Sequence, residues 1–133
     1  MVRIKFVNGT HAIASALYGV LRPGDVLVSA IGAPYDTLMG VIGVNGAGNG
    51  SLREFGVQYR QVNLTPEDAP DIPGIVQAVQ EHHVKAVLIQ RSRGYATRAS
   101  LSVAKIAEII RAIRAVNATV NILVDNCYGE FVE

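Results

Sequence analysis

Residues 86–125 read AVLIQRSRGYATRASLSVAKIAEIIRAIRAVNATVNILVD, and this pattern predicts a strand, a helix and a second strand. Residues 86–89 are all apolar, as expected for a strand that is buried on both faces. Residues 102–117 repeat their apolar side chains three or four positions apart, which places them on one face of a helix. Residues 120–124 are also apolar, apart from Asn121. A strand, a helix and a strand in this order are typical of a parallel sheet.

The same alternation of short apolar runs and longer helical segments extends through the rest of the chain. The patterns predict further strands at 2–7, 26–28 and 57–62, and helices at 11–21, 34–44, 51–55 and 71–82. We therefore expect an α/β fold with three layers, in which helices cover both faces of a mainly parallel sheet. Ligands of such sheets bind at the carboxyl ends of the strands, so the residues that follow each strand are the candidates for chemistry.

Composition sets broad limits on the class of protein. The chain has 133 residues, of which 50% are hydrophobic and 17% charged, so it suits one domain with a real core and not a disordered segment. A net charge of +1 gives no reason to expect nucleic acid or an anionic membrane as partner. Its single cysteine, Cys127, excludes an internal disulfide and a cysteine-based zinc site. The lack of disulfides predicts a cytoplasmic protein, and no apolar run is long enough for a membrane span.

The segment after the first predicted strand has the features of an anion site. Gly9 and Thr10, with His11, open a helix, and the first N–H groups of a helix attract phosphate. The alternative is an ordinary turn in which an asparagine or threonine side chain caps the helix. No Gly-Lys-Ser/Thr motif follows, so this is not a Walker loop.

Two further positions suit a planar, nitrogen-containing ligand. Tyr35 follows the strand at 26–28 and is expected to stack on a ring or act as an acid; the alternative is a surface tyrosine at a helix start. Asp125 ends the strand at 120–124, where a partly buried carboxylate requires a partner; the alternative is an aspartate that caps a turn.

The loop after residues 86–89 carries two guanidinium groups. Arg91, Ser92 and Arg93 are placed to contact a carboxylate or a phosphate, and the alternative is a solvated basic loop.

Five segments together resemble a known family. They occur in the order NGTHAI (8–13), LRPGD (21–25), PYDTL (34–38), QRSRGY (90–95) and VDNCYGEF (124–131). The chain resembles the aluminium-resistance family of pyridoxal-phosphate enzymes, which is similar to methionine γ-lyase and cystathionine β-lyase and has the aspartate-aminotransferase fold. The resemblance covers nearly the whole chain, and the last two segments are its most specific parts.

The resemblance implies a role for each candidate. Gly9, Thr10 and His11 would hold the phosphate of the cofactor, Tyr35 would stack on its ring, and Asp125 would pair with its pyridinium nitrogen. Arg91, Ser92 or Arg93 would contact the cofactor or the substrate carboxylate. A carboxylate beside the ring nitrogen keeps that nitrogen protonated, which makes the ring an electron sink.

The same resemblance implies a carbon–sulfur lyase acting on a sulfur amino acid, and a homo-oligomer. The Schiff-base lysine of the family lies on a later strand, and Lys5, Lys85 and Lys105 occupy other positions. We therefore expect a fragment of the cofactor-binding domain that is inactive alone and prone to self-association. Two alternatives stay open: an α/β module that binds a nucleotide or phosphorylated metabolite, and a scaffold without a ligand.

Overall fold

The computed structural model describes residues 5–46, 48, 50–94 and 96–129. Helices and strands alternate along the chain, in agreement with the sequence pattern. They are α1 (Gly9–Val20), β1 (Val26–Ser29), α2 (Asp36–Ile42), β2 (Gln58–Gln61), α3 (Ile72–Val79), β3 (Val84–Gln90), α4 (Val103–Val116) and β4 (Asn121–Asp125). No helix in the described ranges is long and apolar enough to cross a membrane.

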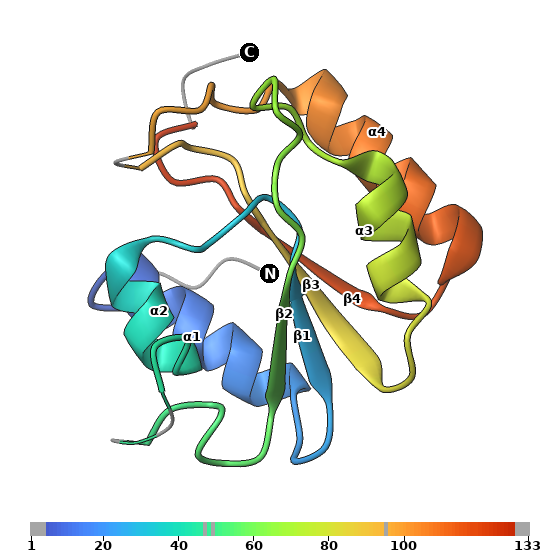
Figure 1. Cartoon of the computed structure of the whole chain (residues 1–133). Coiled ribbons are helices and arrows are strands. Elements are labelled where there is room, and N and C mark those ends of the chain that lie inside the picture. The colour runs from blue at the N-terminus through green and yellow to red at the C-terminus, as the bar shows by residue number, and fades with distance from the viewer. Residues whose placement is uncertain (1–4, 47, 49, 95, 130–133) are drawn as a thin grey trace.

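The four strands form one sheet in the order β2-β1-β3-β4, and every pair is parallel. Figure 1 shows α1 and α2 on one face of the sheet and α3 and α4 on the other. The expected three-layer α/β fold with a parallel sheet is thus confirmed. The carboxyl ends of the strands meet at one edge, where Gln90 of β3 pairs in register with Asp125 of β4.

The apolar core is divided by the sheet into two clusters. One cluster joins Val87 and Ile89 to the buried faces of α3 and α4. The other joins Ala86 and Leu88 to buried residues of α1 and α2. Because neighbouring residues of a strand point to opposite faces, an all-apolar β3 serves both clusters. This arrangement places the ends of β1, β3 and β4 on a well-packed base.

Two predicted elements differ from the structure. Residues 5–7 of the strand predicted at 2–7 are irregular, and residues 2–4 lie outside the described residues. Among the described residues no strand pairs with this segment, and a strand persists only where a neighbour accepts its hydrogen bonds. Residues 51–55, predicted as a helix, form turns instead. Ser51 Oγ accepts the Glu54 N–H at 3.3 Å, as an N-cap side chain would, but no helix follows.

Helix boundaries shift by a few residues from those predicted. The helix predicted at 34–44 begins at Asp36, with Tyr35 as its N-cap, so Pro34 precedes the first turn instead of lying in it. The helix predicted at 71–82 ends at Val79. The helix predicted at 11–21 begins earlier, at Gly9, because the Asn8 side chain caps it. This last shift makes Gly9 the first residue of the helix and affects the candidate phosphate site directly.

Candidate functional site

Four segments that are distant in sequence meet at the carboxyl edge of the sheet. They are the start of α1, the loop between β1 and α2, the end of β3 and the end of β4. Together they line a cavity of about 470 Å³, formed by Gly9, Thr10, Ile13, Tyr35, Asp36, Thr37, Gln90, Ser92, Gly94, Asp125, Cys127 and Tyr128. This volume lies within the range of about 300–1,000 Å³ that is usual for small-molecule sites. Of the candidates named from the sequence, the structure therefore brings together Gly9, Thr10, Tyr35, Ser92 and Asp125.

The start of α1 borders this cavity through Gly9 and Thr10. Asn8 has an extended backbone, and its Oδ1 accepts the His11 N–H at 2.8 Å. The N–H groups of Gly9 and Thr10 lie in the first turn, so they have no acceptor within the helix. His11 does not line the cavity: its ring packs edge-on against Phe6, and its Nδ1 accepts the Val7 N–H at 3.3 Å. Of the three predicted phosphate residues, Gly9 and Thr10 are thus the two with N–H groups available.

Tyr35 is half-buried and tied to the helix start. Its hydroxyl lies 3.0 Å from Thr10 Oγ1, which is in turn 3.3 Å from Thr37 Oγ1. The remainder of the ring packs against the cluster that contains Leu38 and Leu88. One aromatic ring is therefore held at the cavity by its hydroxyl and by apolar packing, which suits stacking on a planar ligand.

Asp125 ends β4 beside the cavity and is half-buried. Its Oδ1 accepts the Cys127 N–H at 3.0 Å, an interaction that fixes the direction of the carboxylate. The Asp125 carboxylate is thus held where it could face the nitrogen of a bound ring. The same hydrogen bond to the Cys127 N–H caps the turn after β4, which is the alternative role expected from the sequence.

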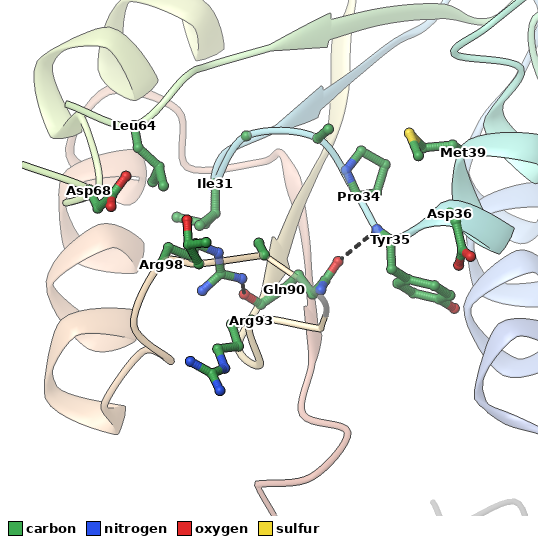
Figure 2. A pocket seen from close by; sticks show the side chains of 14 residues that line it. Ile31, Pro34, Tyr35, Asp36, Met39, Leu64, Asp68, Gln90, Arg93 and Arg98 are labelled. Carbon is green, nitrogen blue, oxygen red and sulfur yellow. Dashed lines mark hydrogen bonds between the residues drawn. The ribbon is translucent and has the colours of Figure 1, made fainter. Parts of the chain in front are cut away.

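The three residues of the basic loop go to different places. Ser92 lines the cavity described above, whereas Arg91 and Arg93 do not. Arg91 is buried, and its guanidinium donates to Leu101 O at 3.2 Å, Asn126 Oδ1 at 2.8 Å and Gly129 O at 2.9 Å. Arg93 is exposed and lines a neighbouring cavity of about 380 Å³. Figure 2 shows its side chain pointing away from Tyr35.

Two residues at this edge were not singled out from the sequence. Gln90 is buried and connects the Tyr35 loop with the loop after β3, and Arg98 is buried beside it. Burial also lowers the pKa of the Arg98 guanidinium. The available signal for Gln90 was a polar residue directly after an apolar strand. Arg98 had no signal, because its partners are backbone carbonyls brought near only by the fold.

Similarity to known proteins agrees with this geometry. A sequence model of the family described as methionine gamma-lyase matches residues 1–133. The chain belongs to the methionine gamma-lyase family. It is 46% identical over 134 residues to the uncharacterized protein YnbB of Bacillus subtilis, covering 100% of this chain and 32% of that protein.

Solved structures agree in fold and sequence. A proposed cystathionine beta-lyase involved in aluminium resistance from Clostridium acetobutylicum superposes with a TM-score of 0.93 at 51% identity, over 100% of this chain and 32% of that one. A carbon-sulfur lyase involved in aluminium resistance from Clostridium novyi superposes with a TM-score of 0.89 at 41% identity, over 98% and 31% of the two chains. The chain thus spans about a third of the length of these members of the family.

The methionine gamma-lyase family implies pyridoxal phosphate as the cofactor of the intact protein. The residues at the cavity fit the three parts of that molecule. The first-turn N–H groups and the hydroxyl of Thr10 suit its phosphate, the Tyr35 ring suits its face, and the Asp125 carboxylate suits its ring nitrogen. Lys85 lies in β3 and Lys105 in α4, where its Nζ is 2.7 Å from Glu108; neither lines the cavity.

Proposed function

We propose that this chain forms part of the cofactor-binding domain of a pyridoxal-phosphate-dependent carbon–sulfur lyase that acts on a sulfur amino acid. The observation that carries the proposal is the single cavity that joins the start of α1, Tyr35 and Asp125. Pyridoxal phosphate bound there would supply an electron sink for breaking bonds at the amino-acid α-carbon. The relatives named as lyases support the class of reaction.

In this proposal each residue has a task that its surroundings suit. Gly9 and Thr10 hold the phosphate with backbone N–H groups that the helix leaves unpaired. Tyr35 would stack on one face of the ring. Asp125 holds a proton on the ring nitrogen, because a fixed carboxylate stabilises the positive charge that this proton creates.

Other parts of the proposal concern the intact protein. Lys85 and Lys105 do not line the cavity, so we propose that neither of them is the lysine that forms the Schiff base. We expect this chain alone to lack lyase activity without that lysine. Ser92 is the remaining candidate of the basic loop for contact with the substrate, since it lines the cavity. Oligomer formation and a cytoplasmic location remain predictions from the sequence.

Equilibrium dialysis of the chain against pyridoxal phosphate, pyridoxal and adenosine monophosphate tests the proposal. Pyridoxal phosphate is expected to bind more tightly than pyridoxal, because only the former offers a phosphate to Gly9 and Thr10. Asp125→Asn preserves shape and removes the charge, so it is expected to weaken binding of pyridoxal phosphate about tenfold, the effect of roughly one lost charge interaction.

Glu67→Gln is the matched control, because it also removes one negative charge and Glu67 is exposed and outside the cavity. Equal affinity of the wild-type and Asp125→Asn chains for pyridoxal phosphate would contradict the proposed role of Asp125. Tighter binding of adenosine monophosphate than of pyridoxal phosphate would favour the nucleotide-binding alternative instead.

A further inference from the structure

Gln90 is a buried polar residue at the end of an apolar strand. The four residues before it in β3 are buried and apolar, and Gln90 itself is 8% exposed. Burial of an amide group lowers stability unless its donors and acceptors are paired. An apolar side chain would extend the core equally well, so the amide at this position needs an explanation in the groups that it contacts.

Both ends of the Gln90 amide bridge to loops that surround the cavity. Its Oε1 accepts the Tyr35 N–H at 3.1 Å, and its Nε2 donates to the Ser92 carbonyl at 3.1 Å. Tyr35 is the N-cap of α2 and makes no side-chain capping bond. The backbone N–H of Tyr35 is therefore anchored to β3, while its hydroxyl is anchored to Thr10. These two anchors restrain the residue at both its backbone and its ring end.

Arg98 holds the bridge from the other side. It is 6% exposed, and its Nη2 donates to the carbonyls of Gln90 at 2.9 Å and Ser92 at 2.6 Å. Its Nη1 donates to the Ala99 carbonyl at 2.9 Å. Figure 2 shows Gln90 lying between Tyr35 and Arg98. A planar guanidinium with several donors is suited to fix several carbonyls at once.

The loop after β3 packs closely on this bridge at Gly94. Gly94 has a φ of +56°, and a Cβ built there would lie 3.4 Å from Gln90 Nε2 and 3.9 Å from the Tyr35 Cβ. Both distances are ordinary van der Waals contacts, so the positive φ, and not a lack of space, favours glycine at this position. Tyr35, Gln90, Ser92 and Arg98 thus form one connected unit, which we call the Gln90 bridge.

We propose that Gln90 is a positioning residue, which holds the Tyr35 ring at the cavity for the cofactor while Arg98 fixes Gln90 in place. This inference rests on the proposed function, because it assigns Gln90 a task in presenting Tyr35 to pyridoxal phosphate. A ring held in place before the ligand arrives loses less entropy on binding, so Gln90 contributes to affinity through its hold on Tyr35.

A purely structural role would have different consequences. If Gln90 only closed the end of the core, its replacement would lower the global stability and increase exchange at all core amides alike. The Tyr35 amide proton would then follow the amides of Leu27 and Val28, which lie in the buried strand β1. A positioning role predicts a selective effect at Tyr35 and a loss of affinity for the cofactor.

The test compares two substitutions of Gln90 in the full chain by amide hydrogen exchange and by dialysis against pyridoxal phosphate. Gln90→Met keeps the length of the side chain and removes both polar ends. Gln90→Glu keeps an acceptor for the Tyr35 N–H, and Arg98 still serves the Ser92 carbonyl. Gln77→Met, at an exposed position of α3, is the matched control for the change from glutamine to methionine.

In Gln90→Met we expect exchange at Tyr35 about tenfold faster, relative to the β1 amides, and binding of pyridoxal phosphate about tenfold weaker. In Gln90→Glu the relative exchange at Tyr35 is expected within about twofold of wild type, because the acceptor for the Tyr35 N–H is retained. The affinity for pyridoxal phosphate is expected to fall in this variant, because the added carboxylate lines the cavity and repels the phosphate. Uniform acceleration at Tyr35 and β1 in Gln90→Met, or unchanged affinity for pyridoxal phosphate in that variant, would overturn the proposal.

Two complications are covered by further measurements: a Gln90→Met variant that does not fold, and a wild-type chain that does not bind pyridoxal phosphate. If Gln90→Met does not fold, Arg98→Lys replaces it, since a lysine keeps the charge but cannot reach all three carbonyls; selective exchange at Tyr35 is again expected, and uniform exchange would overturn the proposal. If the wild-type chain does not bind pyridoxal phosphate, the proposed function fails. The relative exchange at Tyr35 then still shows whether Gln90 positions that residue.

Discussion

Substitution of Asn8 by aspartate is expected to maintain or raise the stability of α1 and to lower the affinity of its first turn for phosphate. Asn8 Oδ1 caps the helix by accepting the His11 N–H at 2.8 Å, and the first turn contains no acidic residue. Asn8→Asp keeps the capping oxygen and adds a negative charge at the positive end of the helix dipole. We expect the free energy of unfolding to stay constant or rise by about 0.3–1 kcal/mol.

The same charge is expected to weaken binding of a phosphate at Gly9 and Thr10. In a water-like dielectric, two unit charges about one helical turn apart, near 5 Å, repel by about 0.8 kcal/mol. A phosphate ester carries between one and two negative charges at pH 7, so the repulsion is about 1.4 kcal/mol. This energy corresponds to about a tenfold loss of affinity.

Two measurements on each protein check the prediction. Urea unfolding gives the stability, and equilibrium dialysis gives the affinities for pyridoxal phosphate and pyridoxal. Asn8→Ala is the companion variant: it removes the cap, so it is expected to lower the free energy of unfolding by about 1 kcal/mol without adding a charge. Pyridoxal lacks the phosphate and should bind Asn8→Asp and wild type equally.

The reasoning would be refuted if Asn8→Asp bound pyridoxal phosphate as tightly as wild type at low ionic strength while remaining folded. It would also be refuted if pyridoxal lost as much affinity as pyridoxal phosphate. The first result would show that the phosphate does not bind at the start of α1. The second would show that the added charge acts on another part of the ligand.

Three further predictions concern the framework around the cavity. Ile89→Ala removes a fully buried side chain of β3, so it should lower the free energy of unfolding by about 2–5 kcal/mol in urea titrations. Burial raises the pKa of the Tyr59 phenol. The folded chain therefore holds that proton more tightly than the unfolded chain, and stability that is complete below about pH 10 falls at higher pH. Tyr59→Phe should reduce the difference in unfolding free energy between pH 9 and pH 11. Gly94→Ala forces a side chain into the left-handed region at φ +56°, so a loss of about 1–2 kcal/mol is expected in thermal or urea unfolding; an unchanged midpoint would contradict it.

Local patterns predicted most of the fold. The apolar runs that became β1, β3 and β4 and the helical spacing that became α4 depend on side chains that are close in sequence. In the structure Ser102 caps α4, because its Oγ accepts the Lys105 N–H at 3.1 Å, and this interaction is equally local. Such elements can be predicted because burial selects the same residue types whatever the neighbours are. The strand at 2–7 was wrong within residues 5–7, since a strand depends on a partner that its own sequence does not name.

For the candidate site, too, some features were predicted from the sequence and others were decided only by the fold. The sequence alone pointed to Gly9, Thr10, Tyr35 and Asp125, because each has a suitable residue type and follows or ends a predicted strand. Parallel strands bring their carboxyl ends to one edge of the sheet, so residues in these places are expected to lie near one another. The sequence also predicted a basic loop, but the fold alone separated its members, placing Ser92 in the cavity and Arg91 among the carbonyls of Leu101 and Gly129.

The tertiary structure alone revealed the Gln90 bridge. Its hydrogen bonds join residues up to 55 positions apart, and Arg98 binds backbone carbonyls, which every residue possesses. The pattern of side chains in the sequence therefore cannot indicate which backbone carbonyls Arg98 binds. The run at 86–125 therefore determines a parallel α/β sheet through burial, whereas the presentation of Tyr35 to the cavity depends on contacts that exist only after the strands have paired.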